Sequence, residues 1–245
     1  YLDVTANKDF KTTIDLALWL QQAIRNKTNL TCSFGLSYNK FLAKEASEYN
    51  KPNGRTVILP EQAQAFLERL AIGEFRGVGA KTKPVLEDMG IKTGADLLQY
   101  SQADLVQRFG KMGLGLYQHA RGIDNRPVLV RDRKSIGKER TYRAVKTTDA
   151  QVEQELKHLA EMVAETLASK QKHGKTVVLK VRDRDFNTIT KRTSLPQFIN
   201  QSTDIFNVAW QLWQQIKPQE IAIRLLGITV TGLEAQQFEN LDLPL

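Results

Sequence analysis

The first 59 residues alternate between strand-like and helix-like hydrophobic patterns. The run "YLDV" at residues 1–4 is typical of a strand, although it carries the carboxylate of Asp3. Thr12 or Thr13 can cap a first helix, and "KPNG" at residues 51–54 is turn chemistry. The expected order is a strand at 1–4, a helix at 12–25, a strand at 29–37, a helix at 39–49 and a strand at 55–60. This is α/β material, but three strands make an incomplete sheet.

From Glu61 to Gly122 short helical patterns are separated by glycines, and strand patterns nearly vanish. The sequence therefore predicts a compact all-α unit. Its helices are expected at residues 61–72, 81–90, 93–100, 101–110 and 113–122.

From Ser135 onward the pattern predicts two strand–helix–strand halves in βαββαβ order. Gly174 is expected to end the first helix, and residues 185–187 to turn the central hairpin. Such an order gives a four-stranded sheet with both helices on one face. The elements are a strand at 135–142, a helix at 149–172, strands at 175–183 and 188–195, a helix at 203–216 and a strand at 221–231.

The other face of this sheet is expected to be open and basic. Side chains alternate between the two faces of a strand, so in the first strand of the hairpin the apolar positions face the helices and the basic ones face away. In the last strand, Ile223 and Leu225 are placed on the helix side. The open face is then solvated, or it is a platform on which cations and hydroxyls bind phosphates. It carries Lys180, Arg182, Thr188, Thr190, Arg192, Ser194 and Arg224.

Charge and composition narrow the class of protein. With 35 basic and 27 acidic residues, a net charge of +8 and a pI of about 9.5, the 245-residue chain favours a polyanionic partner. The single cysteine, Cys32, excludes an internal disulfide and a cysteine-based zinc site. There is no signal-peptide pattern and no apolar run long enough for a membrane, so we expect a cytoplasmic protein.

"FRGVGAKTKPVLEDMGI" carries the most specific local signal. Gly77, Val78 and Gly79 between two short helices are the pattern of a helix-hairpin-helix, in which a tight turn presents backbone N–H groups to a DNA phosphate. Lys81 and Thr82 follow and add charge and a hydroxyl group. Most Gly-x-Gly sequences are ordinary turns, but here both flanking helices favour a contact that positions a duplex without reading its sequence.

"NKFLAKEASEYNKPNG" places Lys40 and Lys44 four residues apart on one helix face, near a helix start that favours anions. A solvent-exposed lysine pair is the commoner outcome of this spacing, and the pattern leaves both interpretations open.

These stretches, together with "YLDVT", "SFGLSYNK", "RFGKMG", "ARGIDNRPV" and "RKSIGKERTY", resemble in order and spacing the Y-family translesion DNA polymerases of the DinB type. The resemblance covers nearly the whole chain. It implies an α+β multi-domain fold. The parts are the C-terminal part of an α/β palm at 1–59, a helix-hairpin-helix thumb at 60–126, a basic tether at 127–134, a βαββαβ little finger at 135–233 and a tail at 234–245.

The resemblance also implies residue roles. Lys44 matches a palm lysine that contacts the triphosphate of the incoming nucleotide, and the Gly77–Gly79 turn matches the thumb hairpin that holds primer-strand phosphates. The little-finger grip on the duplex matches Lys180, Arg182, Thr190, Lys191 and Arg224. Strand alternation puts Lys191 on the opposite face, so either a bulge intervenes or Lys191 makes no contact.

In this family, Mg²⁺ held by carboxylates bridges the nucleotide and the primer end. Both carboxylate motifs are missing from this sequence, and Asp3 matches a position downstream of them. We therefore expect a monomer that binds primer–template DNA but does not polymerise, from a parent enzyme that uses deoxynucleoside triphosphates and Mg²⁺.

The C-terminal "NLDLPL" resembles the hexapeptide by which bacterial DNA-processing proteins bind the sliding clamp. Asn240 stands where glutamine is usual, which weakens the match, and Leu241, Leu243 and Leu245 supply the apolar side chains. A frayed apolar tail is the alternative.

Two other classes remain for the whole chain. One is a stand-alone, non-catalytic DNA-binding module. The other is a helix-hairpin-helix glycosylase or nuclease, which is disfavoured because one cysteine cannot hold an iron–sulfur cluster.

Overall fold

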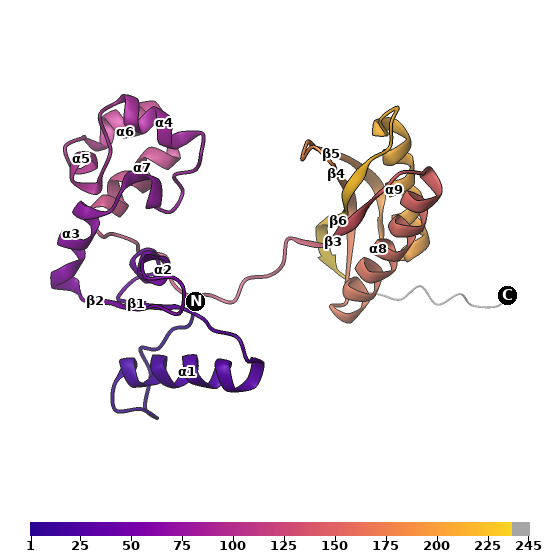
Figure 1. The fold of residues 1–245 in the computed structure, drawn as a ribbon. Coiled ribbons are helices and arrows are strands. Elements are labelled where there is room, and N and C mark those ends of the chain that lie inside the picture. The colour runs from indigo at the N-terminus through magenta and orange to yellow at the C-terminus, as the bar shows by residue number, and fades with distance from the viewer. Residues whose placement is uncertain (237–245) are drawn as a thin grey trace. The chain divides into compact units, whose positions relative to one another are not determined.

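The computed structural model describes residues 1–236. The chain divides into two compact units, unit 1 at residues 1–130 and unit 2 from Arg131 onward (Figure 1). Each unit has its own hydrophobic core. Among the described residues, no helix is long and apolar enough to cross a bilayer.

Unit 1 opens with helix α1 (Thr13–Thr28), which starts at a capping box formed by Thr12 and Asp15. Strands β1 (Phe34–Ser37) and β2 (Arg55–Ile58) pair in parallel, and helix α2 (Lys40–Tyr49) connects them. The two helices and these two strands are confirmed. α2 lies so close to β1 that a Cβ atom at Gly35 would be 2.2 Å from the carbonyl oxygen of Ala43.

The strand expected at residues 1–4 is wrong. These residues form no ladder in the structure, and Leu2 is 72% exposed. The Asp3 carboxylate accepts the Thr5 N–H at 3.0 Å, and the Asn7 N–H donates to Val4 O at 3.1 Å. Short polar side chains that bind their own backbone favour turns over strands, which explains the difference.

The rest of unit 1 is helical, as expected. Thr93 and Ser101 cap two of its helices through the backbone N–H groups of Asp96 and Asp104. Apolar side chains of α2 pack with those of the later helices in one core, and the expected boundary between residues 59 and 60 stays a prediction. The helices are α3 (Pro60–Arg69), α4 (Thr82–Asp88), α5 (Gly94–Leu98), α6 (Gln102–Phe109) and α7 (Lys111–Ala120), with a 3₁₀ turn at Ile72–Glu74.

Unit 2 is an antiparallel sheet in the order β3-β6-β4-β5, with both helices on one face (Figure 1). The buried side chains of α8 and α9 pack against alternate residues of the strands, so the predicted βαββαβ layer is confirmed. The elements are β3 (Ser135–Lys146), α8 (Asp149–Ser169), β4 (Lys172–Asp183), β5 (Thr188–Ile199), α9 (Ser202–Ile216) and β6 (Ile223–Ala235).

Gly174 does not end the first helix of unit 2. α8 stops at Ser169, and Gln171, at φ +50°, turns the chain into β4. Gly174 lies inside β4, where an added Cβ atom would be 2.4 Å from a methyl group of Val230. Glycine is therefore required at position 174 by the close packing between strands, and it has no role in capping α8.

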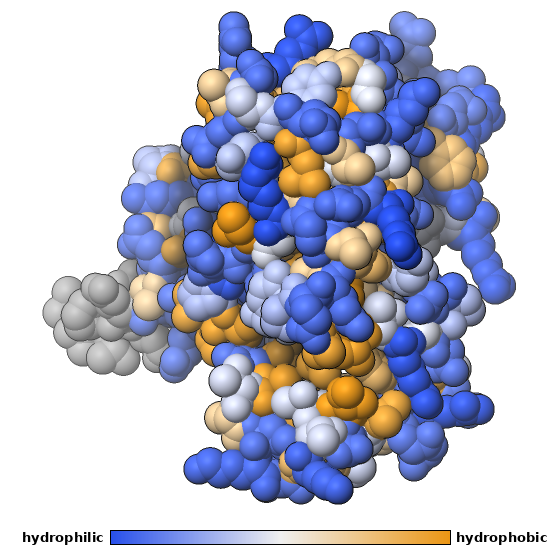
Figure 2. Space-filling model, turned by 90° about the vertical axis from the view of Figure 1, so that its left-hand side faces the viewer, coloured by the Kyte–Doolittle hydropathy of each residue, from blue (hydrophilic) through white to orange (hydrophobic). Residues whose placement is uncertain are grey.

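An open groove of about 510 Å³ lies between α1, β1 and the first residues of unit 1. Its lining includes the apolar side chains of Leu20, Ile24 and Phe34. Figure 2 shows hydrophobic residues gathered at the level of α1, where Ile14 and Trp19 are also exposed.

Candidate nucleic-acid interface

The turn between the 3₁₀ helix and α4 presents unpaired backbone donors at its surface. Gly77 adopts φ +102°, a conformation that favours glycine. Within residues 1–236, the N–H groups of Gly77, Gly79 and Ala80 have no protein acceptor. A Cβ atom at Gly77 or Gly79 would meet nothing within 4 Å, so a large ligand has room to approach. We call residues 75–81 the hairpin turn.

Val78 anchors the hairpin turn. Its side chain is 9% exposed and belongs to the core of unit 1. Its N–H donates to Phe75 O at 2.9 Å, so the group is not available to a ligand. Lys81 is exposed beside the turn, whereas Thr82 is half-buried and begins α4. Of the site residues predicted in this turn, Val78 is therefore an apolar anchor, and the residues on either side of it provide exposed donors.

Lys44 is ion-paired with Glu48 on the next turn of α2. Glu48 also pairs with Lys51, and hydrogen bonds from Lys44 and then Lys51 lower the pKa of Glu48 to about 2. Lys44 is thus held by a carboxylate of its own helix.

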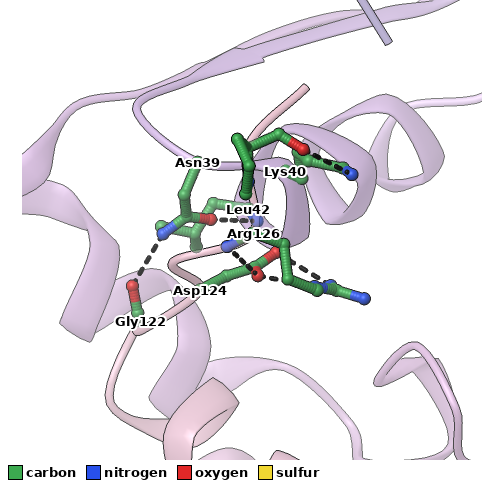
Figure 3. Close-up of polar contacts among 7 residues, drawn as sticks. Asn39, Lys40, Leu42, Gly122, Asp124 and Arg126 are labelled. Atoms are coloured by element: carbon green, nitrogen blue, oxygen red, sulfur yellow. Dashed lines mark hydrogen bonds and ion pairs between the residues drawn. The ribbon is translucent and has the colours of Figure 1, made fainter. Parts of the chain in front are cut away.

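Asn39 joins α2 to the segment that follows α7 (Figure 3). Its Oδ1 accepts the Leu42 N–H at 2.9 Å and so caps α2, while its Nδ2 donates to Gly122 O at 2.7 Å. Gly122 has φ +67°, and a Cβ atom there would lie 2.9 Å from the Tyr38 hydroxyl. Glycine at this position therefore permits the close contact.

The segment after Gly122 is held by two further contacts (Figure 3). The Asp124 side chain is 2% exposed and accepts hydrogen bonds from Arg126 Nε at 2.6 Å and Nη2 at 2.8 Å. These bonds lower the pKa of Asp124. Lys40 Nζ donates to Pro127 O at 3.2 Å. Lys40 thus binds a backbone carbonyl of its own chain.

Glu45 was not predicted as a site residue. It lies on α2, is 4% exposed and accepts the Arg76 N–H of the hairpin turn at 2.8 Å. Burial raises its pKa to about 7. Helical spacing from Phe41 and Leu42 places Glu45 on the buried face of α2, but the sequence gives no sign of its partner, because the contact comes from a loop 31 residues away.

The open face of unit 2 carries mainly polar side chains. Register pairs Lys180 with Thr190 and Arg182 with Thr188, and residues paired directly across a ladder share a face. Val177, Leu179 and Val181 are 5% exposed or less and belong to the core. The predicted placement of Lys180, Arg182 and Thr190 on the face away from the helices is confirmed.

Lys180 and Arg182 of β4 each have a partner on this face. Lys180 Nζ is 2.7 Å from the Glu139 carboxylate on β3, across Gly227 of β6. A Cβ atom at Gly227 would lie 2.9 Å from that of Glu139, so glycine leaves space for the ion pair. Arg182 Nε donates to the Thr188 hydroxyl at 2.8 Å.

Strand alternation fails at Arg224. Arg182 pairs with Leu225 and the next residue pairs with Ile223, so Arg224 is the extra residue of a bulge. Leu225 therefore lies in the open-face row of Arg182, not with Ile223 on the helix side as expected. The Arg224 guanidinium lies 4.9 Å from the ring centroid of Phe186, which lies in the loop that joins β4 and β5.

Lys191 lies on the face opposite to Lys180. It pairs with Leu179, and the register runs unbroken from Thr188 to Ser194. Of the two interpretations left open above, the structure excludes a bulge at Lys191.

Two further sequence expectations, the clamp-binding peptide and the metal site, can be compared with the described residues. The clamp-binding peptide, with Asn240, Leu241, Leu243 and Leu245, lies outside them. Within residues 1–236, no group of three or more His, Cys, Asp or Glu side chains is arranged to hold a metal ion.

Three family models match parts of the chain. The impB/mucB/samB family matches residues 1–48, its C-terminal domain matches residues 133–243, and the thumb domain of DNA polymerase iota matches residues 74–124.

Close relatives carry the name DNA polymerase IV. The protein of Streptococcus pneumoniae serotype 4 is 49% identical over 234 residues, which are 95% of this chain and 66% of the relative. That of Listeria monocytogenes serotype 4b is 46% identical over 245 residues, which are 99% of this chain and 69% of the relative. The chain thus spans about two thirds of the length of the relatives it matches.

The fold has a solved counterpart. A Y-family DNA polymerase chimera of Dbh and Dpo4 superimposes with a TM-score of 0.72 at 25% sequence identity, covering 93% of this chain and 66% of that one. Sequence relatives, family models and fold agree, and the chain belongs to the Y family of DNA polymerases.

Proposed function

We propose that this chain is the DNA-holding part of a DNA polymerase IV-type enzyme, which copies damaged or mispaired templates by template-directed nucleotidyl transfer in DNA repair and damage tolerance. The observation that carries the proposal is the hairpin turn, where the unpaired N–H groups of Gly77, Gly79 and Ala80 stand beside Lys81 with open space above them. Backbone donors with a neighbouring cation bind phosphate without reading bases.

The open face of unit 2 supplies the second grip in this proposal. Lys180, Arg182 and Arg224 contribute positive charge, and the Thr190 hydroxyl contributes a short donor. In unit 1, Lys44 contacts the triphosphate of the incoming nucleotide once it has left Glu48. The basic tether at 127–134 links the two grips.

The experiment that tests the proposal uses Gly79→Ala. Gly79 is not among the glycines with a positive φ and has an open Cβ position, so the variant should fold like the parent while its methyl group occupies the space a phosphate needs. We expect affinity for a primer–template duplex to fall about tenfold, the loss of roughly one charge-assisted hydrogen bond.

Gly115→Ala is the matched control. It also has an open Cβ position but lies in α7, outside the hairpin turn. It should bind DNA like the parent protein. Unchanged affinity in Gly79→Ala, with circular dichroism showing both variants folded, would refute the hairpin turn as a phosphate site.

We also propose that the 245-residue chain binds DNA without extending a primer. The resemblance assigns the Mg²⁺-binding carboxylates to motifs that this sequence does not contain. A primer-extension assay with Mg²⁺ and all four deoxynucleoside triphosphates should give no product, and measurable extension would contradict the proposal.

The remaining proposals concern partners and location. The tail residues Asn240, Leu241, Leu243 and Leu245 bind the sliding clamp, and the protein acts as a cytoplasmic monomer. Removing residues 240–245 should abolish clamp binding and leave DNA affinity unchanged. Retained clamp binding would rule out the tail assignment.

A further inference from the structure

Glu45 is a buried acid for which the proposed contacts give no role. It lies on the face of α2 that packs into the core of unit 1, between the buried residues Leu42 and Ala46. Its Oε1 accepts the Arg76 N–H at 2.8 Å. A buried carboxylate is costly unless it is hydrogen-bonded, so its one backbone partner is informative.

Arg76 immediately precedes the three residues that form the tip of the hairpin turn. One residue earlier, Phe75 is 1% exposed, and its ring centroid lies 6.0 Å from that of Phe41 on α2. The hairpin turn is thus attached to α2 at two successive residues, through a ring contact at Phe75 and a hydrogen bond at Arg76. Val78 adds an apolar anchor one residue beyond Gly77.

This attachment decides which way the donors of the turn face. At a turn with φ +102° at Gly77, the peptide groups on either side rotate easily because glycine has few steric limits. The hydrogen bond to Glu45 fixes the peptide between Phe75 and Arg76, which directly precedes the two peptide groups that flank Gly77, and so limits the movement of the turn before a ligand arrives. Preorganised donors bind an anion more tightly than donors that must first be ordered.

The charges facing Glu45 come from three elements. Glu48 on α2 and Glu74 in the 3₁₀ turn disfavour its ionised form, and Arg76 in the hairpin turn favours it. Burial is the largest effect and outweighs that of Arg76, so the pKa of Glu45 is raised to about 7. The strength of the bond to Arg76 therefore changes near neutral pH, because an ionised acceptor makes a stronger hydrogen bond than a neutral one.

We propose that Glu45 is a positioning residue for the hairpin turn: by accepting the Arg76 N–H from α2, it holds the turn so that Gly77, Gly79 and Ala80 present their N–H groups to a DNA phosphodiester. The DNA part rests on the proposed function, and the attachment of the turn to α2 does not.

The test compares two variants of the full chain. Glu45→Gln keeps an acceptor oxygen without the charge, and Glu45→Met keeps the length of the side chain without an acceptor. Glu61→Gln, an exposed glutamate on α3, is the matched control. Affinity for a fluorescein-labelled primer–template duplex is measured by anisotropy at fixed salt. We expect Glu45→Met to bind about fivefold more weakly, the effect of one lost hydrogen bond, and the two Gln variants to bind within twofold of the parent.

The amide resonance of Arg76 provides a readout that needs no DNA and no unstable variant. In ¹H–¹⁵N spectra of the parent chain it should shift downfield with a midpoint near pH 7 as Glu45 ionises, and it should not titrate in Glu45→Gln. An Arg76 amide that ignores pH in the parent chain would overturn the positioning role.

The two readouts separate the two proposals. If the parent chain binds DNA and a folded Glu45→Met variant binds it equally tightly, the positioning role of Glu45 is refuted. The proposed function is not affected by that result. If the parent chain does not bind DNA at all, the proposed function and the DNA part of this inference are both refuted. An Arg76 amide that titrates would still establish the attachment of the turn to α2.

Discussion

At the scale of single residues, the carboxyl group of Glu45 makes the stability of unit 1 depend on pH. Its pKa is raised from 4.5 to about 7, chiefly by burial. Unfolding exposes the group to water and lets it release its proton at lower pH. Its contribution to stability is therefore complete below about pH 4.5 and is lost as the pH rises through 7.

Glu45→Gln should remove this dependence. At about 1.4 kcal/mol per pKa unit, the difference in unfolding free energy between Gln and Glu should grow by roughly 2–3 kcal/mol from pH 5 to pH 8, in favour of Gln. Urea denaturation of the full chain with peptide-resolved hydrogen exchange measures it for unit 1. A difference that stays constant with pH would contradict the raised pKa.

The elements show where sequence patterns succeed and where they stop. The alternation of apolar and polar residues correctly predicted that Lys180, Arg182 and Thr190 lie on the open face. Such alternation is visible in the sequence because one face of the sheet is buried. The bulge at Arg224 could not be predicted from the sequence, since its position depends on how β6 pairs with the neighbouring strands. The contact between Glu45 and Arg76 was equally invisible, because it joins distant elements.

Lys180 and Lys191 make a matched pair for the open face. They lie on adjacent strands and on opposite faces of the sheet. Lys180→Ala should weaken duplex binding and reduce the log–log salt slope by about one unit, whereas Lys191→Ala should change neither. Glu139→Gln should strengthen binding, because it frees Lys180 from its ion pair. Salt titrations of all three variants by fluorescence anisotropy test this, and equal effects of the two alanine variants would exclude the open face as the binding surface.

Asn39 tests how α2 is joined to the end of α7. Asn39→Asp keeps the acceptor that caps α2 but sets a carboxylate against the carbonyl of Gly122, 2.7 Å from the present donor. We expect unit 1 to lose about 1–2 kcal/mol of stability, with faster hydrogen exchange in α2 and residues 120–127.

Asn26→Asp is the control for this substitution. Asn26 accepts one hydrogen bond, from Gln22, and lies on the exposed side of α1. It should cost less than about 0.5 kcal/mol. Equal exchange rates in the two variants would show that the bond from Asn39 to Gly122 contributes nothing.

At the scale of the whole molecule, charge and motif order are the properties that sequence conveys best. The excess of eight basic residues and the order of motifs led to the family that the relatives confirm. The charge did not show which cations are free. Between Arg131 and Lys146, Arg140 and Lys146 both face Glu155 of α8, at 3.7 and 2.8 Å. Only the folded structure shows which basic side chains form such ion pairs and which are available to DNA.

In the proposed function, this chain holds the backbone of duplex DNA and does not read its sequence. The most direct test is the affinity of the full chain for two primer–template duplexes of unrelated sequence, measured over a range of salt concentrations. We expect equal affinities for the two duplexes, with log K falling linearly against log salt at a slope of roughly −0.9 per neutralised phosphate. An affinity that does not change with salt, or a strong preference for one of the two sequences, would contradict it.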